Sequence, residues 1–399
     1  MRYRFASLSE AIESVASRAR VSLGVEKLCV DSAVSRVCAR DYESPIDVPP
    51  APSSAVDGYA VRSVDTFGAS RSSPIELALG SECREGVASR VFTGDRLPPG
   101  CDAVVMMEDA EDLGDRVLIY RAVPSYANVR RAGEDIRRGE VIARRGVVLR
   151  PWHVAALAAC GFSDVEVFER LRIGVLVVGS EVREPSYGVE AYSKGLVLNS
   201  SGPLVLAALR ELGFVEATYL GIARDDPREI ASMVSRALEN AHAVVTVGGT
   251  GPSSRDVTAR AIEALGGEVV VRGIAIRPGR PTSAAVVDGK PVFMLSGFPV
   301  AAFVGLTYFA LPALARALGI ELQMHRCVAE LRRRLPSSSG YTCFARARAR
   351  IEGRKLAVEP LAIRGSGNIS TLLRGNAIIV VPEGVEGFEE GDDVVIDLL

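Results

Sequence analysis

The chain of 399 residues is too long for one hydrophobic core of typical size, and we expect two to four domains. Its apolar fraction of 48% and charged fraction of 24% are those of an ordinary globular protein. The net charge of −2 provides no global field that would attract nucleic acid or an acidic membrane, so neither is an expected partner.

Residues 7–40 place apolar positions at helical spacing, and the proline-rich stretch "SPIDVPPAP" then ends this pattern. Short apolar runs between glycine and proline turns predict a small β-rich domain over residues 51–135. A helical pattern returns over residues 136–170. We therefore expect a discontinuous N-terminal linking domain, residues 1–50 and 136–170, into which the β-rich domain is inserted.

From residue 171 onward, apolar strands alternate with amphipathic helices. This rhythm predicts a doubly wound, mostly parallel α/β domain over residues 171–322. Residues 297–315 are uncharged and almost long enough to span a bilayer. Their internal prolines and the apolar strand before them favour a core helix over a membrane span.

Residues 323–399 contain short strands that predict a C-terminal β-barrel or sandwich. In the run "FARARAR", a period of two predicts Arg346, Arg348 and Arg350 on one face of a strand. That face is either a solvated surface or an anion-binding edge.

Cysteine and histidine usage restricts the kinds of site. The seven cysteines show no CxxC pair and no regular spacing, which favours a reduced compartment over a disulfide framework. The three histidines lie far apart, which disfavours a zinc or iron site. Charged residues interrupt the N-terminus, so no signal peptide is predicted and we expect a cytoplasmic protein. Scarce Gln, Asn and Lys suggest a thermostable protein, although codon bias also raises arginine content.

Acidic residues follow three predicted strands of the α/β domain, at the edge where parallel sheets bind ligands. Glu181 follows the first strand, Asp225 and Asp226 follow the second, and Asp256 follows the third. Each fits a helix cap, and Pro227 makes that interpretation strong for Asp226. Acids that converge on one crevice suit Mg²⁺ bridging to phosphate oxygens, or an acid–base role.

A glycine-rich turn, "GGTGPSSRD", follows the third strand and fits neither common nucleotide signature. It lacks the lysine of a P-loop, and Ser254 stands where a dinucleotide fingerprint has its third glycine. Because an acid repels phosphate, the turn suits a phosphate only with a cation between them. Its candidate ligand contacts are Gly248, Gly249, Thr250, Gly251 and Ser253.

A second turn, "RPGRP", places Arg277 and Arg280 on either side of a stiff Pro-Gly pair. Two guanidinium groups so placed suit a tetrahedral or multiply charged oxyanion. The alternative is a surface turn with solvated arginines. Ser296 ends a further strand near the same edge, so phosphate and oxyanion groups are expected in one site.

In order and separation, these motifs resemble the molybdopterin molybdotransferase family, which includes MoeA and the E domain of gephyrin. The resemblance covers nearly the whole chain and is carried by "SSAVDGYAVR", "VFTGDRLPPGCDAVVMMED", "RRAGEDI", "RPGRP", "SGFPVA" and "GSGNIS". It implies an enzyme that hydrolyses adenylylated molybdopterin with Mg²⁺, inserts molybdate or tungstate at the dithiolene, and releases AMP. It also implies a homodimer whose site is completed across subunits.

The resemblance assigns roles to residues of this chain. The contributions expected from the other subunit are Asp57, Thr93 and Asp135, and the resemblance also implies Thr93 and Gly94 as molybdopterin or adenylate contacts. The residues expected at the cation and the pyrophosphate are Glu181, Asp225 and Asp256, and the implied catalytic set is Asp57, Asp135 and these three acids. Ser296 and Pro299 join the glycine turn as molybdopterin or adenylate contacts. The implied oxyanion-binding residues are Arg277, Gly279, Arg280, Arg346, Ser366 and Ser370.

Several positions depart from the family pattern. The family's "GDEL", "GGVSVG" and "LPGNP" are "GSEV", "GGTGPSSRD" and "LSGFP" here, and arginines replace lysines at 277 and 280. The glycine turn is similar to that of the MogA-type enzyme, which adenylylates molybdopterin and shares the α/β domain. Two alternatives therefore stay open: a molybdopterin adenylyltransferase and a non-catalytic molybdopterin-binding scaffold. Because arginine is a wider, planar cation than lysine, the residues at 277 and 280 are expected to influence whether molybdate or tungstate is bound.

Overall fold

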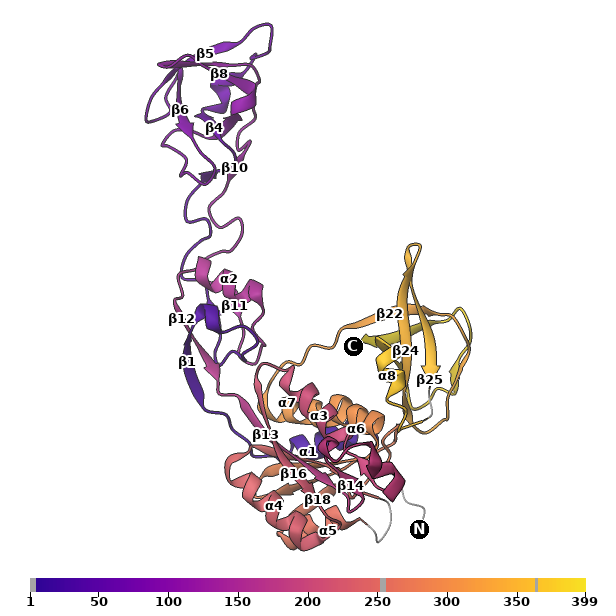
Figure 1. Cartoon of the computed structure of the whole chain (residues 1–399). Coiled ribbons are helices and arrows are strands. Elements are labelled where there is room, and N and C mark those ends of the chain that lie inside the picture. The colour runs from indigo at the N-terminus through magenta and orange to yellow at the C-terminus, as the bar shows by residue number, and fades with distance from the viewer. Residues whose placement is uncertain (1–4, 252–255, 363–364) are drawn as a thin grey trace.

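A computed structural model describes residues 5–251, 256–362 and 365–399. The molecule is elongated: a β-rich region lies at one end, a narrow connector follows, and an α/β layer and a C-terminal β-barrel lie side by side at the other end (Figure 1). The multidomain α/β fold class expected from the sequence is confirmed. The domain limits given above remain predictions.

The β-rich region is a six-stranded curled sheet whose strands follow the order β7-β4-β6-β5-β9-β8. These strands are β4 (Gly58–Val61), β5 (Ile75–Leu79), β6 (Val87–Val91), β7 (Ala103–Met106), β8 (Ala110–Asp112) and β9 (Arg116–Ile119). Alternate side chains such as Tyr59, Leu77 and Val117 face inward and form a small separate core.

Two cysteines of this region form a disulfide. Cys83 and Cys101 are 18 residues apart, and the turn at Pro99 brings their Cα atoms to 5.0 Å. The prediction of reduced thiols is therefore wrong for this pair, because spacing along the chain carries no information on proximity across a turn. Cys29, Cys38, Cys160, Cys327 and Cys343 are free thiols.

The connector consists of short antiparallel pairs and one helix. Its elements are β1 (Val25–Cys29) with β12 (Asp164–Phe168), β2 (Tyr42–Glu43) with β11 (Val141–Ala143), β3 (Ser53–Ser54) with β10 (Val129–Arg130), and α2 (Pro151–Ala159). The helix predicted over residues 7–40 is realised only in α1 (Leu8–Ala16), which Ser7 caps. Residues 25–29 alternate in exposure and pair with β12 instead, so strand pairing overrides the helical spacing.

The α/β layer has the strand order β16-β13-β17-β21-β20-β18. Its strands are β13 (Leu171–Val178), β16 (Val215–Ala223), β17 (Ala243–Gly248), β18 (Glu268–Val271), β20 (Ser283–Val287) and β21 (Lys290–Leu295). The first four strands in this order are parallel, and β20 runs antiparallel to both neighbours. The sheet is therefore mostly parallel, as predicted.

Helices cover both faces of this sheet. One face packs against α4 (Pro227–Asn240) and α5 (Val257–Ala264). The other packs against α1, α3 (Ser201–Arg210), α6 (Pro299–Gly305) and α7 (Leu311–Leu318). A π-helical turn, Leu306–Ala310, joins α6 to α7 into one apolar helix of 20 residues, and 67% of its most apolar stretch of 18 residues is buried. The prediction of a core helix is confirmed for this segment.

The C-terminal barrel closes five strands into a ring, because β24 pairs with both β25 and β26. Its strands are β22 (Arg326–Leu331), β24 (Thr342–Glu352), β25 (Lys355–Ala362), β26 (Ala377–Val381) and β28 (Asp393–Leu398), and its helix is α8 (Ser370–Arg374). A short pair, β23 (Leu335–Pro336) with β27 (Gly387–Phe388), lies beside it. Strand β19 (Ile276–Arg277) leaves the α/β layer and pairs with β24, which fixes the barrel to the turn that follows β19.

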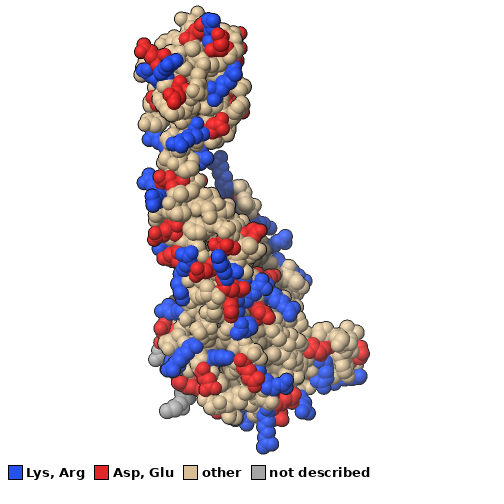
Figure 2. All heavy atoms as spheres, turned by 90° about the vertical axis from the view of Figure 1, so that its left-hand side faces the viewer, with Lys and Arg blue, Asp and Glu red and all other residues tan. Residues whose placement is uncertain are grey.

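The charges on the surface are mixed. On the face shown in Figure 2, blue and red side chains are interspersed from the β-rich end to the α/β layer. This distribution agrees with a net charge of −2, because neither sign dominates the view.

Candidate active site

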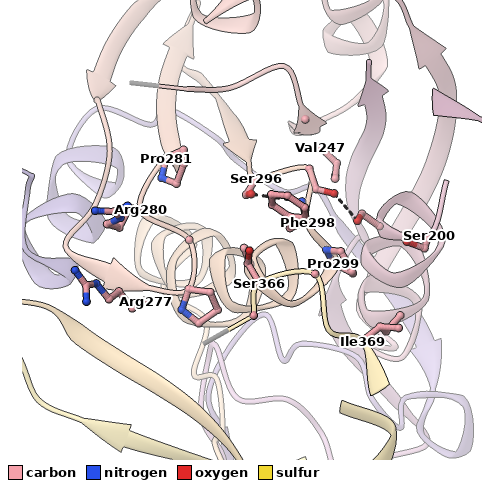
Figure 3. A pocket seen from close by; sticks show the side chains of 18 of the residues that line it. Ser200, Val247, Arg277, Arg280, Pro281, Ser296, Phe298, Pro299, Ser366 and Ile369 are labelled. Atoms are coloured by element: carbon pink, nitrogen blue, oxygen red, sulfur yellow. Dashed lines mark hydrogen bonds between the residues drawn. The ribbon is translucent and has the colours of Figure 1, made fainter. Parts of the chain in front are cut away.

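A cavity of about 1760 Å³ lies at the carboxyl edge of the α/β sheet, where β13, β17 and β21 end. The C-terminal barrel supplies its opposite wall through residues 333–338, 360–362, 365–367 and Ile369. Figure 3 shows this arrangement: the turn of Arg277 and Arg280 lies on one side, and the loop of Ser366 faces Phe298 and Pro299. Two domains therefore build one cavity.

The glycine turn after β17 forms part of the wall. Gly248 has φ +97°, and a Cβ atom there would lie 2.2 Å from the carbonyl oxygen of Val178, so only glycine fits. The Thr250 hydroxyl donates to the Pro281 carbonyl at 3.0 Å, which ties the glycine turn to the arginine turn. Of the candidate ligand contacts in this turn, Gly248, Gly249 and Thr250 line the cavity and Gly251 does not, and their ligand roles stay predictions. Ser253 lies outside the described residues.

Two of the predicted acids, Glu181 and Asp225, line the same cavity. The Ser180 amide donates to Asp225 at 2.8 Å, and the Asp225 amide donates to the Ser180 hydroxyl at 3.0 Å. These reciprocal bonds hold the ends of β13 and β16 together. Asp226 instead caps α4 by accepting from the Arg228 amide at 3.0 Å, which is the structural role considered for it above.

Asp256 lies apart from these two acids. It is buried, caps α5 by accepting from the Ala259 amide at 2.9 Å, and does not line the cavity. Burial raises the pKa of its carboxyl above the ordinary value, which disfavours the charged form. Among residues 5–251, 256–362 and 365–399, no three His, Cys, Asp or Glu side chains form a group that could hold a metal ion. In this structure, Glu181 and Asp225 are the acids placed to face a ligand.

The arginine turn is held from both domains. Arg277, Gly279 and Arg280 line the cavity, and Gly279 has φ +118°. Arg277 donates to the Ser338 hydroxyl at 2.7 Å, and strand pairing of β19 with β24 fixes its backbone. The turn is therefore an ordered contact between the α/β layer and the barrel, and the alternative of a freely solvated surface turn is wrong for Arg277.

The segment after β21 completes the wall beneath the barrel. Ser296 is buried, and its hydroxyl accepts from the Phe298 amide at 3.4 Å. Pro299 begins α6, and the Val300 amide donates to the Ser366 carbonyl at 3.0 Å. Ser296, Pro299 and Ser366 all line the cavity, and their ligand-binding roles stay predictions.

Arg346 is fully buried, whereas Arg348 and Arg350 are exposed. The prediction that these three arginines share one face agrees with the structure, because Ala345, Ala347 and Ala349 all pack into the barrel core on the other face. Arg346 differs from the other two in exposure, and its Nε donates to the Thr371 hydroxyl of α8 at 3.2 Å. Burial lowers the pKa of the Arg346 guanidinium to about 10. Neither Arg346 nor Ser370 lines the cavity, so their predicted oxyanion roles remain predictions.

Asp57 and Thr93 lie together in the β-rich region, next to β4 and after β6, and neither lines the cavity. The amide and hydroxyl of Thr93 donate to one oxygen of Asp57 at 2.7 and 2.8 Å. These bonds lower the pKa of Asp57, so it is a carboxylate at neutral pH. Gly94 follows Thr93 in the same loop, and Asp135 is exposed in the connector, where its amide donates to the Val48 carbonyl.

Several lining residues were missed by the sequence reasoning. The start of α3 contributes Asn199, Ser200 and Ser201, although the sequence indicated only a capped helix there. The barrel contributes Arg333, Arg334, Ser337 and Ser338, to which the sequence analysis gave no role in the site. The Ser337 hydroxyl is buried and, within the described parts of the chain, has no hydrogen-bond partner. The sequence does contain a signal for these residues, since the run "RRRLPSSS" places serines next to clustered arginines, a combination that suits an anion site.

Three family models match successive parts of the chain. They are "MoeA N-terminal region (domain I and II)" at residues 6–161, "Probable molybdopterin binding domain" at residues 174–316, and "MoeA C-terminal region (domain IV)" at residues 328–399. These matches cover the connector with the β-rich region, the α/β layer and the barrel in turn.

The chain is 36% identical over 383 residues to a molybdopterin biosynthesis protein of Methanocaldococcus jannaschii, covering 94% of this chain and 92% of the relative. It is 30% identical over 402 residues to the molybdopterin molybdenumtransferase of Staphylococcus aureus, covering 98% and 95%. The crystal structure of the MoeA protein from Pyrococcus horikoshii OT3 matches with a TM-score of 0.83 and 31% identity, covering 99% of this chain and all 100% of that one.

Fold and cavity together define a multidomain α/β protein with a ligand site between its parallel sheet and a C-terminal barrel. The chain belongs to the MoeA family. The family resemblance predicted from the sequence motifs is confirmed.

Proposed function

We propose that this protein is a molybdopterin molybdotransferase, which inserts molybdate into adenylylated molybdopterin and releases AMP. The observation that carries the proposal is the joining of a glycine turn, carboxylates and two arginines in one cavity. The first two features suit a pyrophosphate with a cation, and the arginines suit a tetrahedral oxyanion. The name of the Staphylococcus aureus relative supports the same activity.

Further features of the cavity fit the proposed substrates. Tyr192 and Phe298 line the cavity and are about 60% exposed, so their rings are free to pack on a flat pterin or adenine. The buried Ser337 hydroxyl, which finds no partner among the described residues, lies in the barrel wall close to Ser338, the acceptor of Arg277. An oxyanion near Arg277 would give such a hydroxyl an acceptor.

The donor set fits Mg²⁺, which favours one or two carboxylates together with substrate phosphate oxygens. Glu181 and Asp225 would hold the ion, and its charge would offset the repulsion between these carboxylates and the pyrophosphate. Asp256 joins this set only if its capping contact with α5 opens.

A second copy of the chain completes the proposed site. Asp57, Thr93 and Asp135 belong to the β-rich region and the connector, which extend away from the cavity of their own chain (Figure 1). A homodimer in which this end reaches the partner's cavity would bring the Asp57 carboxylate to the adenylylated pterin. We expect this dimer in the cytoplasm.

A molybdopterin adenylyltransferase is the second candidate, and the glycine turn "GGTGPSSRD" favours it. A non-catalytic molybdopterin-binding scaffold is the third. The retained acids at 57, 181 and 225 favour an enzyme over a scaffold, and the full-length match favours the transferase over the adenylyltransferase.

The proposal is tested by incubating the purified protein with adenylylated molybdopterin and Mg²⁺ and measuring AMP release with and without molybdate or tungstate. Oxyanion-dependent release is expected and would also show which oxyanion is used. Adenylate formation from ATP and molybdopterin, without such release, would identify the adenylyltransferase. Tight pterin binding with neither reaction would identify a scaffold.

A further inference from the structure

Tyr341 contacts both arginines of the cavity turn. The guanidinium carbon of Arg277 lies 4.0 Å from the centre of the Tyr341 ring, and that of Arg280 lies 6.0 Å from it. Both distances are within the range of cation–π attraction. In Figure 3, the side chains of Arg277 and Arg280 extend from the turn on the same side. One aromatic ring thus attracts two positive charges.

Tyr341 itself does not line the cavity, whereas both arginines and Ser338 do. It lies directly before β24, the barrel strand that pairs with β19 at Arg277. The Phe5 ring, whose centre is 6.4 Å away, also contacts it. Tyr341 is therefore a support behind the arginines, fixed by the junction of the two domains.

The two guanidinium groups need such support because like charges repel and exposed arginines turn toward water. Ser338 accepts a hydrogen bond from Arg277 at 2.7 Å, so Arg277 is held by a hydroxyl and a ring. Arg280 is exposed and depends more on Tyr341. Consistent with this pairing, the pKa of the Tyr341 hydroxyl lies below its ordinary value because Arg280 first, and then Arg277, stabilise its charged form.

We propose that Tyr341 is a positioning residue that holds Arg277 and Arg280 as a paired binding site for a tetrahedral oxyanion. A guanidinium fork that is already ordered loses less entropy when it binds an anion. The inference rests on the proposed function, since it concerns the oxyanion end of the same cavity. Replacing Tyr341 affects the affinity for the oxyanion, whereas the rate at saturating oxyanion is retained.

The first experiment measures molybdate binding to the full-length protein by calorimetry, without a pterin. Tyr341→Leu removes the ring, and we expect about tenfold weaker binding. Tyr341→Phe keeps the ring and loses the hydroxyl, so we expect a loss of only about two- to threefold. Ser338→Ala is expected to weaken binding by a similar small factor, because Arg277 loses one of its two anchors.

Tyr126→Leu is the matched control, because Arg131 lies 4.1 Å over the Tyr126 ring in a part of the chain away from the cavity. It should leave molybdate affinity unchanged. The second experiment measures AMP release: Tyr341→Leu should raise the half-saturating molybdate concentration while the rate at saturation stays within about twofold.

Wild-type protein that binds molybdate, together with a Tyr341→Leu variant of equal affinity, would overturn the inference and leave the proposed function standing. A wild-type protein that binds no oxyanion would overturn both. If Tyr341→Leu does not fold, unchanged affinity in both Tyr341→Phe and Ser338→Ala overturns the role of Tyr341. An equal loss in Tyr126→Leu would show a general destabilisation and would also overturn it.

Discussion

The α/β cavity and the β-rich end contain different parts of the predicted site, and they are built in different ways. In the cavity, Glu181, Asp225 and Arg277 come from separate segments that one sheet and one barrel bring together. At the β-rich end, the Asp57 carboxylate accepts hydrogen bonds from the amide and the hydroxyl of a single residue, Thr93. The cavity is a walled space of a kind that can enclose a ligand. The Asp57–Thr93 pair instead exposes one ordered carboxylate to solvent.

This difference indicates that the β-rich end serves the chemical step and that the α/β cavity binds the substrate. A carboxylate with a lowered pKa is charged at neutral pH and suits a role at a cation or as a base. The cavity supplies the shape and charge that bind the substrate. If the proposal is correct, damage at the β-rich end lowers turnover without loss of binding, and damage at the arginine turn lowers binding.

The largest effect is expected for Asp57→Ala. Turnover should fall by at least about a hundredfold, because a charged group that acts on the reacting centre is lost. Binding of the pterin ligand to the cavity should be unchanged. Asp115→Ala is the control, since Asp115 is an exposed acid of the same region whose carboxylate pairs with Arg116. Unchanged yield of cofactor in Asp57→Ala would remove Asp57 from the mechanism.

Mixing variants tests whether the two regions meet across subunits. Asp57→Ala and Glu181→Ala are each expected to be inactive, but a mixed dimer would contain one site with both residues intact. Activity should therefore return on mixing after subunit exchange. Mixed protein that exchanges subunits, shown by labelled chains, and that stays inactive would contradict assembly of the site across the dimer.

The next effect is on oxyanion affinity. Arg277→Ala should raise the half-saturating molybdate concentration by about tenfold or more, because a charge-assisted hydrogen bond to the anion is lost. Arg280→Ala should have a smaller effect, since Arg280 is more exposed. Arg348→Ala is the control from an exposed position of the barrel. Wild-type molybdate dependence in both turn variants would show that the turn does not bind oxyanion.

The two regions also differ in how far sequence reasoning could reach. Residues that follow parallel strands were predictable as cavity residues, because carboxyl ends of such strands meet at one edge, and Glu181 and Asp225 do so. Asp256 follows the same rule, yet its side chain caps α5, since a buried helix start needs an acceptor for its amides.

Contacts between domains were not predictable from local pattern. The positions of Ser338 and Tyr341 depend on β19 joining the barrel, and a pairing of two residues has no signature in the sequence. Arg346 is buried because α8 packs against β24 at that position, and the alternation along a strand does not predict which helix covers it. The Cys83–Cys101 bond depends on a turn in the same way.

The disulfide gives a test of stability confined to the β-rich end. Replacing both Cys83 and Cys101 by serine should cost about 3 kcal/mol, because the bond closes a loop of 18 residues in the unfolded chain. Thermal unfolding of wild type and variant, followed region by region by amide hydrogen exchange, would locate the loss. Cys29→Ser, at an exposed free thiol, is the control. Equal destabilisation of the α/β layer would show that the two regions unfold as one unit.

The smallest effect concerns the α/β layer and is a dependence of its stability on pH. His242 is buried beside β13, where its Nδ1 accepts from the Arg172 amide at 3.0 Å. Burial, and then the charge of Arg172, lower the pKa of His242 to about 4. Because this folded-state pKa lies below the ordinary value of about 6.5, the unfolded chain binds the proton first as pH falls.

The stability contributed by neutral His242 is therefore complete above about pH 6.5 and is lost as the pH falls toward 4, by about 2 kcal/mol once screening by solvent is allowed for. His242→Asn keeps an acceptor for Arg172 without a titrating group, so it should flatten urea-unfolding stability over this window in the α/β layer alone. His325→Asn, at a histidine outside this contact, provides the control. An unchanged slope in His242→Asn would assign the pH dependence to other groups, and a change at the β-rich end would show that the two regions are energetically coupled.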